Sequence, residues 1–428
     1  MDIEILSKFN PWWVEKNVPA ELTGTHKRPI LDEIYKYLDK RYIILLYGLR
    51  RVGKTTILYQ IIDELLKKGE EPANILYFSF DDKTASIGEI ISAYEEKVRK
   101  KRIGESERAY LFFDEIQKVG DWQSDIKILY DLHPRLKIFL SGSASIALQR
   151  KSKESLAGRI IDLFVTPLTF SEFLQWKGVN IDMKKPEMFQ LEIKPHFMDY
   201  LRKGGFPEII NENSDEIIRK YIKNAVIEHI IYQDLPREFG LKDIGLLKIL
   251  LEAIANEPGM IVNIDRLVRD LKRNRITIGN YLEYLRYGLL VSIISNLREG
   301  MLVSSRKNKK VYPANCSFCF AYRDDFFADN VLEKVAETVV SSHINAEYYY
   351  RNSFEIDFVK KSKGEPIPIE VKYGSAETRQ LKLFRAKFNA PKGLLISRDT
   401  FAQEDGIKVV PLWFFLLQPT EKTIDWNG

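Results

Sequence analysis

The sequence has few of the residues that staple small secreted folds or bind metals through sulfur. Its 428 residues include only two cysteines and five histidines, which excludes a disulfide framework and a zinc site built from cysteine alone. Long apolar runs are missing too, because 42–49 and 409–417 each fall well short of a membrane span. The amino end lacks the basic start and apolar core of a signal peptide. We therefore expect a cytoplasmic protein in a reducing setting, with no membrane partner.

An excess of one charge is also missing. Lysine and arginine number 65 against 60 aspartate and glutamate, a formal net charge of +5. Such a balance does not indicate a nucleic-acid partner, so any basic surface has to be local. Apolar residues make up 45% and charged residues 29%, as in ordinary compact proteins. At roughly 150 residues per domain the length predicts about three domains, and the lack of a fixed-period repeat excludes a solenoid.

Strand and helix patterns alternate between residues 42 and 165. The apolar runs there are continuous, as is required of strands that are buried on both faces of a parallel sheet. We predict a three-layer α/β domain, preceded by an irregular arm and by a helix over 31–38. The predicted strands are 42–47, 75–80, 110–113, 136–140 and 160–165.

A phosphate-binding pattern follows the first predicted strand and precedes a helical run. In such a loop the glycines let backbone N–H groups face phosphate, while Lys54 charges the β and γ phosphates and the Thr55 hydroxyl binds Mg²⁺. The pattern therefore predicts a nucleoside triphosphate site. The motif G-x-x-x-x-G-K-[ST] and the threonine after it correspond to Gly48, Leu49, Arg50, Arg51, Val52, Gly53, Lys54, Thr55 and Thr56.

Two acids end the predicted strand 110–113. A nucleoside triphosphatase needs one carboxylate there to hold Mg²⁺ and another to polarise the attacking water. We assign the metal to Asp114 and the base to Glu115.

Hydroxyl and guanidinium groups farther along the chain are further candidates. The strand 136–140 leads into 141–143, where Ser143 could sense the γ phosphate, with a plain turn as the alternative. Arg159 precedes the last strand and could reach phosphate within the chain or across a subunit boundary. Arg50 and Arg51 are its rivals, and pairing with acidic neighbours is the alternative for each of the three.

Helical patterns over 246–254, 264–271 and 277–290 are followed by a strand and a basic hairpin. This order predicts a winged helix-turn-helix whose third helix and hairpin contact DNA. The alternative is a solvated charged loop on a module that packs against its neighbours. The expected contacts are Arg273, Arg275, Thr277 and Asn280 on the third helix, and Arg306, Lys307, Lys309 and Lys310 on the hairpin.

A charged hairpin lies near the carboxyl end. Side chains alternate along strand 367–373, so Glu370 and Lys372 share a face, and pairing with strand 354–359 can bring Asp357 beside them. Clustered carboxylates repel unless a cation neutralises them, and Mg²⁺ would do so while Lys372 orients water or stabilises a pentavalent phosphate. We call these three residues the carboxyl-terminal triad.

Several segments together resemble the AAA+-related ATPases found widely in archaea and bacteria. The resemblance implies ATP and Mg²⁺ binding, a helical lid after the core and, loosely, a sensor role for Ser143. The segments are 48–56, 113–117, 141–143, 156–159, 167–173 and 204–207, with the sequences GLRRVGKTT, FDEIQ, SGS, LAGR, PLTFSEF and GGFP.

The carboxyl-terminal triad resembles the PD-(D/E)XK nuclease family, whose members hydrolyse DNA or RNA phosphodiesters on a small mixed sheet. The resemblance implies Mg²⁺ or Mn²⁺ as the metal, bound by Asp357 and Glu370, and adds an acid on an upstream helix. Glu333 fits that position and Glu337, one turn later, is its rival. Ile356 replaces the usual proline, and Gln380 is similar to a supporting polar residue of some relatives.

These interpretations combine into one hypothesis, a Mg²⁺-dependent ATPase that couples ATP binding and hydrolysis to DNA engagement and metal-dependent phosphodiester cleavage. The alternative is an ATP-driven regulatory switch of oligomeric state with an inert nuclease-like binding domain. A homo-oligomer is expected in both cases. The expected divisions are an arm (1–27), a P-loop parallel-sheet α/β core (28–166), a helical lid (167–239), a winged helix-turn-helix (240–314) and a small α/β nuclease-like domain (315–428).

Overall fold

The computed structural model describes residues 1–81, 85–104, 108–143, 156–181, 185–297, 309–362, 364–374 and 377–419. The chain forms two compact units, Met1–Thr166 and Pro167–Gly428, called here the amino-terminal and carboxyl-terminal units. No helix within the described ranges is both long and apolar enough to cross a membrane.

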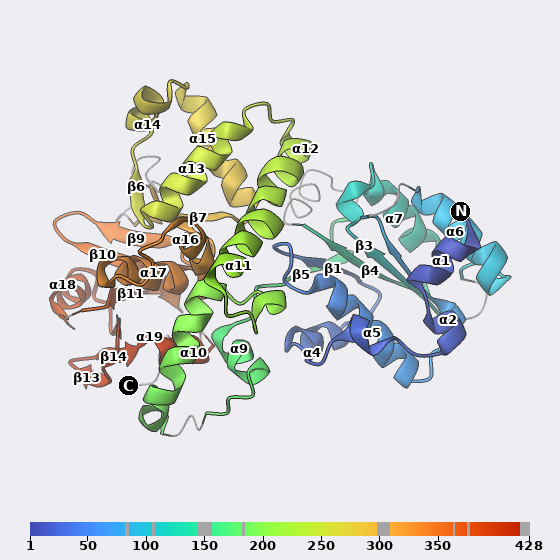
Figure 1. Ribbon diagram of the computed structural model, residues 1–428, viewed down its shortest axis with the longest axis horizontal. Coiled ribbons are helices and arrows are strands. Elements are labelled where there is room, and N and C mark those ends of the chain that lie inside the picture. Colours follow the sequence, from blue (N-terminus) through green and yellow to red (C-terminus); the bar gives the residue numbers. More distant parts are fainter. Residues whose placement is uncertain are drawn as a thin grey trace. The chain divides into compact units, whose positions relative to one another are not determined.

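A parallel sheet forms the centre of the amino-terminal unit (Figure 1). In the described part of this unit the strand order is β2-β3-β4-β1-β5, and every neighbouring pair is parallel. The three middle strands and β2 are buried almost throughout, as continuous apolar runs predict. The predicted strands are therefore confirmed, with small shifts at their ends: β1 Ile43–Tyr47, β2 Ile75–Ser79, β3 Ala109–Asp114, β4 Leu136–Gly142 and β5 Ile160–Phe164.

Helices cover this sheet and enclose its core. They bury apolar side chains such as Ile57, Ile61, Ile90 and Ile126. The predicted helix over 31–38 is shorter than expected, because α4 ends at Tyr35. The main helices are α4 Ile30–Tyr35, α5 Lys54–Lys67, α6 Ile87–Tyr94 and α7 Trp122–Leu132.

The prediction of an irregular arm over 1–27 is wrong. The structure places helices α1 Ile3–Phe9, α2 Trp12–Glu15 and α3 Ala20–Thr23 there. They are too short to show helical periodicity. Hydrogen bonds hold α1 and α2 against edge strand β2, whereas α3 is joined to α5 by Gln60 Nε2, which donates to the Thr23 carbonyl at 2.7 Å. Asn10 exchanges two hydrogen bonds with the Tyr77 backbone, at 2.7 and 2.9 Å, and the Trp13 indole donates to the Ile75 carbonyl at 2.8 Å. Helices α1 and α2 therefore cover an otherwise open sheet edge.

The carboxyl-terminal unit begins with helices, as predicted for 167–239. Some turns there are π-helical, over Tyr221–Glu228 and Ile230–Asp234. The α-helices are α9 Phe170–Trp176, α10 Gln190–Lys203, α11 Asp215–Lys220 and α12 Leu235–Phe239.

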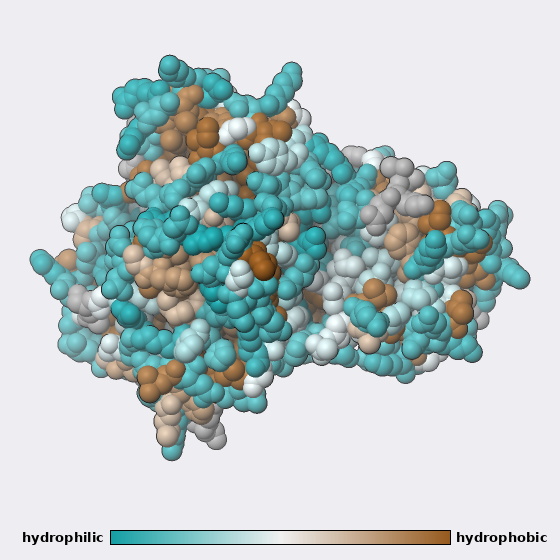
Figure 2. Space-filling model, in the orientation of Figure 1, coloured by the Kyte–Doolittle hydropathy of each residue, from teal (hydrophilic) through white to brown (hydrophobic). Residues whose placement is uncertain are grey.

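A helical module with a small antiparallel sheet follows. Strand β8 pairs with both β6 and β7 in antiparallel fashion. Strand β6 is only three residues long and was not predicted from the sequence. On the face drawn in Figure 2, hydrophobic residues gather over α13 to α15 amid a mostly hydrophilic surface. The elements are α13 Ile244–Asn256, β6 Met260–Val262, α14 Ile264–Leu271, α15 Arg275–Tyr287, β7 Val291–Asn296 and β8 Lys309–Pro313.

The last segment extends this sheet. Across the described residues of the unit the strand order is β13-β14-β12-β11-β10-β9-β7-β8-β6, and β9 joins β7 in parallel, with Ser295 opposite Tyr348. The sheet is thus continuous across the division expected at residue 314. The elements are α16 Cys316–Tyr322, α17 Asp329–His343, β9 Tyr348–Arg351, β10 Glu355–Ser362, β11 Glu365–Lys372, α18 Arg379–Phe388, β12 Gly393–Ser397, β13 Ala402–Glu404, β14 Ile407–Pro411 and α19 Leu412–Leu417.

Candidate functional site

The loop between β1 and α5 is fixed by close backbone packing. A Cβ on Gly48 would lie 2.3 Å from the Val165 carbonyl oxygen, so only glycine fits there. Gly53 has φ +92° and begins α5 without a side chain to cap it. The first N–H groups of α5 therefore have no side-chain acceptor from the cap residue, which suits a phosphate. Buried Arg28 donates to Val52 O at 3.3 Å and to Thr166 O at 2.7 Å, which ties the loop to the chain after β5.

The Lys54 ammonium folds back over this loop. Its Nζ donates to the carbonyl oxygens of Leu49 at 2.9 Å and Gly48 at 3.4 Å, and the residue is only 5% exposed. A buried cation needs acceptors, and here the loop itself supplies them. The lysine therefore lies at the loop, where a triphosphate requires positive charge.

Hydroxyl groups surround the Asp114 carboxylate. Thr55 Oγ1 donates to Asp114 Oδ2 at 2.7 Å, and the Tyr77 hydroxyl donates to the same oxygen at 2.9 Å. The Ser141 hydroxyl donates to Oδ1. Burial and the Asp114 charge raise the pKa of Tyr77 well above its usual value, so its hydroxyl stays a donor. Throughout the part of the chain that the structure describes, Asp114 forms no ion pair.

Glu115 follows in a left-handed backbone conformation, with φ +55°. Its Oε2 accepts a 2.6 Å hydrogen bond from Gln117 Nε2, and its N–H donates to Ser141 Oγ at 3.3 Å. The carboxylate is thus oriented by a neutral amide beside Asp114. This arrangement fits the expected division between a metal ligand and a water-polarising acid.

The contacts of Ser141 and Tyr77 with Asp114 were not predicted from the sequence. Strand β4 lies between β1 and β3, so the end of β4 is adjacent to Asp114, and Ser141 makes the contact there. Ser143 is buried just beyond the end of β4, and its role stays a prediction. Tyr77 could be found only from the register of β2 beside β3, which no local pattern specifies.

The expectation that Arg159 reaches phosphate within its own chain is wrong. Strands β1 and β5 are parallel, with Ile43 opposite Ile160, so Arg159 lies at the amino edge of the sheet. The phosphate-binding loop follows the carboxyl edge, a strand length away. Arg159 Nε instead lies 3.4 Å from Asp131 Oδ1. Arg50 and Arg51 lie in the loop itself, where Arg51 has φ +65°.

The carboxyl-terminal triad does come together on paired strands. Phe358 of β10 lies opposite Ile369 of β11, which places Asp357 beside Glu370. The Asp357 N–H donates to Glu370 Oε2 at 3.3 Å, and Lys372 Nζ lies 3.0 Å from Glu370 Oε1. Both carboxylates are buried, with 8% and 3% exposure.

Of the two upstream acids, Glu337 is the one whose charge acts on Asp357, which favours the rival of Glu333 for that position. Glu337 lies on the buried face of α17, accepts from the Tyr312 hydroxyl at 2.9 Å and pairs with Lys334 at 2.8 Å. Burial is the main cause that raises the pKa of Asp357, and the charge of Glu337 is the second. Glu333 is half-buried, and its charge acts on Lys372 instead.

Lys310 is also placed differently from the expectation. It was predicted to contact DNA phosphate, yet its side chain is only 5% exposed. Its Nζ forms an ion pair with Glu355 Oε1 at 2.5 Å and lies 3.8 Å from Asp357 Oδ1. The Tyr349 ring lies beside the same ammonium, with 5.2 Å to its centroid. Lys310 therefore belongs to the acidic cluster and is removed from the DNA-contact set.

Burial and mutual repulsion shape the acid–base properties of this cluster. Burial raises the pKa of Asp357 to about 6 and that of Glu370 to about 7, and in each case a neighbouring carboxylate adds to the effect. Burial opposes the charge of Lys310, but Asp357, Glu337 and Glu355 outweigh it, so the pKa of Lys310 is raised. Among the described residues, no group of three or more His, Cys, Asp or Glu is placed to hold a metal ion.

The other expected DNA contacts are at the surface of the helical module, and each cation there has an acidic neighbour. The pairs are Arg273 with Asp243 at 2.9 Å, Arg275 with Asp265 at 2.9 Å, and Lys309 with Glu283 at 3.5 Å. Asn280 is exposed on α15, while Arg306 and Lys307 lie outside the described residues.

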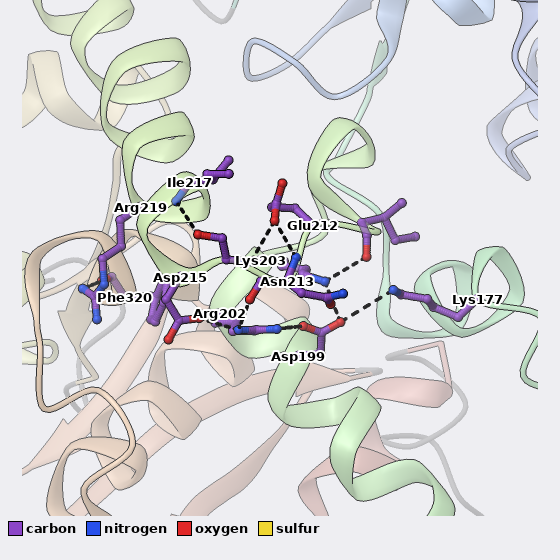
Figure 3. Close-up of polar contacts among 12 residues, drawn as sticks. Lys177, Asp199, Arg202, Lys203, Glu212, Asn213, Asp215, Ile217, Arg219 and Phe320 are labelled. Atoms are coloured by element: carbon purple, nitrogen blue, oxygen red, sulfur yellow. Dashed lines mark hydrogen bonds and ion pairs between the residues drawn. The ribbon is translucent and has the colours of Figure 1, made fainter.

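A further charged cluster surrounds Asp199 near the end of α10 (Figure 3). Its carboxylate accepts from Arg202 Nη2 and from Lys203 Nζ, both at 2.7 Å, and lies 3.8 Å from Lys177 Nζ. Lys203 is fully buried and also donates to Ile210 O at 2.9 Å. Burial lowers the pKa of Lys203 against the opposing charge of Asp199. These contacts join α10 to the following turn, which indicates a structural role.

The GGFP segment lies in that turn and is explained by packing. Gly204 has φ +64°, and a Cβ there would lie 2.0 Å from Asn315 Oδ1. Gly205 has φ +76°, and its Cβ would lie 2.2 Å from the Leu168 carbonyl oxygen. A side chain at Gly204 would collide with the side chains of Asn315 and Ser317, and one at Gly205 would collide with the Leu168 backbone, so the segment acts as a close junction within the carboxyl-terminal unit.

Comparison with known sequences defines the class of the first site. An AAA domain matches residues 40–174, and this range includes the phosphate-binding loop, Asp114 and Glu115. The match and the five-stranded parallel sheet described above define an ATPase domain of the AAA, P-loop kind. Residues 194–324 and 331–415 match two domains of unknown function, DUF8612 and DUF4143.

Similar proteins from two organisms align with most of this chain. The uncharacterized protein MJ1544 of Methanocaldococcus jannaschii is 29% identical over 398 residues, which cover 87% of each chain. An uncharacterized protein of Haemophilus influenzae is 26% identical over 400 residues, 91% of this chain and 97% of its own.

Among solved structures, the Walker-type ATPase PABY2304 of Pyrococcus abyssi has a TM-score of 0.40 at 19% identity, with 70% of this chain and 96% of that chain covered. The Aeropyrum pernix ORC1 protein in complex with DNA has a TM-score of 0.34 at 13% identity, with 74% and 97% covered.

Proposed function

We propose that the chain is a Mg²⁺-dependent ATPase whose nucleotide cycle acts on its carboxyl-terminal unit. The observation that carries the proposal is the 2.7 Å hydrogen bond from Thr55 Oγ1 to Asp114 Oδ2. A loop hydroxyl and a strand-end carboxylate are the protein groups that hold Mg²⁺ in P-loop ATPases, and here they lie in direct contact. Their fit to the metal is further supported by the hydroxyl donors of Asp114, which leave its charge uncompensated.

Each residue of the site has a separate role in this proposal. Residues 48–56 hold the triphosphate through backbone N–H groups, and Lys54 supplies charge to it. Thr55 and Asp114 hold Mg²⁺, which when bound neutralises the charge on the phosphates. Glu115 orients and polarises the attacking water, held in place by Gln117.

Two variants separate binding from chemistry. Lys54→Ala is expected to lose ATP binding in titration calorimetry, because the loop loses its ammonium. Glu115→Gln is expected to retain ATP binding while turnover falls roughly 100-fold or more. Lys67→Ala removes an exposed lysine from the same helix, one that pairs with Asp63, and serves as the matched control. Wild-type turnover in both site variants would refute the assignment.

We also propose that the module from α13 to β8 is a winged helix-turn-helix that engages DNA. Its support is the order of three helices and an antiparallel sheet, with Arg273 and Arg275 exposed at the start of α15. Their ion pairs are at the surface, and such pairs are worth only about 0–1 kcal/mol, so phosphate can replace the acids.

The DNA proposal is tested by the salt dependence of binding. Arg273→Ala with Arg275→Ala should weaken binding to duplex DNA and reduce the slope of log affinity against log salt by roughly one per lost phosphate contact. Arg286→Ala, on the last turn of the same helix and paired with Glu283 at 2.6 Å, is the matched control. An unchanged slope would remove α15 from the interface.

Of the two alternatives for the carboxyl-terminal triad, we favour the inert binding domain over metal-dependent cleavage. The supporting observation is that four carboxylates of the cluster already have a lysine partner, namely Glu337, Glu355, Asp357 and Glu370. Nicking of plasmid DNA with Mg²⁺ or Mn²⁺ that is lost in Asp357→Ala would reverse this preference.

The expected homo-oligomer stays part of the proposal. Only a second copy of the chain would bring Arg159 to a bound nucleotide, because Arg159 lies at the sheet edge opposite the phosphate-binding loop of its own chain. Light scattering with a nonhydrolysable ATP analogue, on wild type and on Arg159→Ala, tests this point. A monomer under all conditions would exclude a role in trans.

A further inference from the structure

The chain itself supplies cations to the acidic cluster of the carboxyl-terminal unit. Asp357 has Lys310 at 3.8 Å, Glu370 has Lys372 at 3.0 Å, and Glu337 has Lys334 at 2.8 Å. The lysines come from β8, β11 and α17. These lysines therefore reduce the repulsion among the carboxylates without a metal.

Lys310 differs from the other two lysines because it is almost fully buried and comes from a strand outside the β10–β11 hairpin. Side-chain exposure is 5% for Lys310 but 33% for Lys372 and 49% for Lys334. Its ammonium lies between Glu355 and Asp357 and beside the Tyr349 ring. A buried ammonium is costly unless carboxylates surround it, so the lysine and the acids depend on one another.

Strand β8 makes a second contact with the cluster. Tyr312, two residues after Lys310, donates its hydroxyl to Glu337 Oε2 at 2.9 Å. One short strand thus brings a cation to the acids of β10 and a neutral donor to the acid of α17. Both contacts lie at the position where the resemblance to nucleases implies a divalent metal.

The residues present do not fit that metal. Mg²⁺ requires near-octahedral oxygen ligands at about 2.1 Å, whereas Asp357 Oδ2 accepts from the Val371 N–H at 3.0 Å and Oδ1 faces Lys310. Within the described residues no set of three or more candidate ligands converges. A second cation would also be repelled by the buried ammonium.

We propose that the Lys310 ammonium is the resident cation of this cluster and excludes divalent metal from it. The cluster then acts as a joint that docks β8 onto β10 and α17, and not as a metal-dependent hydrolytic site. This inference rests on the inert-domain alternative of the proposed function and gives it a physical cause.

The test is Mn²⁺ binding, measured by titration calorimetry and by electron paramagnetic resonance without nucleotide. An Asp114→Asn background removes the metal ligand of the amino-terminal unit, so any site observed belongs elsewhere. In that background we expect no Mn²⁺ site that depends on Asp357. Lys310→Met should create a site at least tenfold tighter than any in its parent, and adding Asp357→Asn should abolish it.

Two matched variants refine the result. Lys309→Met removes the neighbouring lysine of β8, which is 40% exposed and pairs with Glu283, and should gain no site. Lys310→Arg keeps a positive charge and should still exclude Mn²⁺. An Asp357-dependent Mn²⁺ site in the parent protein would overturn the proposal, as would a folded Lys310→Met protein that gains none.

Folding and function controls keep the outcomes separate. If Lys310→Met does not fold, the parent protein and Lys310→Arg still test the proposal. A tight Asp357-dependent Mn²⁺ site in either protein would show that the cluster does not exclude divalent metal. ATP turnover is measured on chains with Asp114 intact, where Lys310→Arg should match wild type. Absent turnover in wild type would refute the proposed ATPase and leave the Mn²⁺ result unaffected.

Discussion

Asp114 at the end of β3 and Asp357 on β10 are both buried aspartates. The groups that contact their carboxylates differ in charge. The carboxylate of Asp114 accepts only from hydroxyl groups in the described structure, whereas that of Asp357 lies beside the Lys310 ammonium. The hydroxyl donors of Asp114 belong to Thr55, Tyr77 and Ser141.

This difference shows how a buried carboxylate can stay available to bind a metal. Neutral donors fix the orientation of a carboxylate but leave its full negative charge, so a divalent cation gains the whole attraction. An ammonium cancels that charge in advance and must be displaced. The sequence predicts both aspartates to be metal ligands. The chemistry of the groups that contact them distinguishes the two sites.

The largest expected effect is on ATP turnover. Asp114→Asn should lower turnover on the order of 100-fold, because the metal loses its protein carboxylate. Asp357→Asn, the equivalent change in the other unit, should leave turnover unchanged. Steady-state phosphate release at saturating Mg²⁺ measures both. Equal losses in the two variants would contradict the distinction between the sites.

The next effect concerns the free energy of unfolding. Lys310→Met leaves buried carboxylates without their cation and should destabilise the carboxyl-terminal unit by about 3 kcal/mol. Lys309→Met, at an exposed pair, should cost less than about 1 kcal/mol. Hydrogen exchange of the peptides that cover β8, β10 and β11 reports the change locally. If Lys310→Met and Lys309→Met show equal protection from hydrogen exchange, Lys310 is not the partner on which the acidic cluster depends.

A smaller effect is expected from a single neutral donor. Tyr77→Phe removes one hydrogen bond to Asp114 and leaves its charge intact, so the Mg²⁺ concentration for half-maximal ATP turnover should rise roughly tenfold. Tyr94→Phe removes the hydroxyl of another buried tyrosine of this unit, which donates to Ala73 O at 2.7 Å, and is the matched control. A Tyr77→Phe enzyme with the Mg²⁺ dependence of wild type would remove Tyr77 from the site.

The features that the sequence predicted are local ones. The loop 48–56 is a contiguous pattern, the buried strands around it are continuous apolar runs, and the register of one hairpin places Asp357 beside Glu370. Arg159 could have been corrected from the same information. A residue that precedes a parallel strand lies at the opposite sheet edge from a loop that follows one.

The features that the sequence did not predict depend on long-range pairing. Lys310 reaches Asp357 because the strands of the helical module join the carboxyl-terminal sheet through β7 and β9, which no short motif encodes. Ser141 and Tyr77 reach Asp114 through the order and register of the sheet. Helices α1 and α2 are held by Asn10 and the tryptophans after it, and they are too short for their sequences to show periodicity.

The smallest effect is a pH dependence that distinguishes the buried acids of the carboxyl-terminal unit. Burial raises the pKa of Asp357 to about 6 and of Glu370 to about 7, whereas unfolded carboxyls titrate near 4. Between about pH 4 and 7 the folded unit therefore binds more protons than the unfolded chain, so its free energy of unfolding falls as pH rises.

This pH dependence can be measured as a difference between proteins. Protection factors of β10 and β11, corrected for intrinsic exchange at each pH, should decrease from pH 5 to 7 more steeply in wild type than in Asp357→Asn, by up to about 1.4 kcal/mol per pH unit for one proton. Asp399→Asn, a partly exposed acid of the same unit, should keep the wild-type slope. Asp114→Asn should keep it as well, because that aspartate lies in the other unit. If Asp357→Asn is as steep as wild type, the Asp357 carboxyl stays ionised over this range, and repulsion among the acids is already cancelled by the lysines.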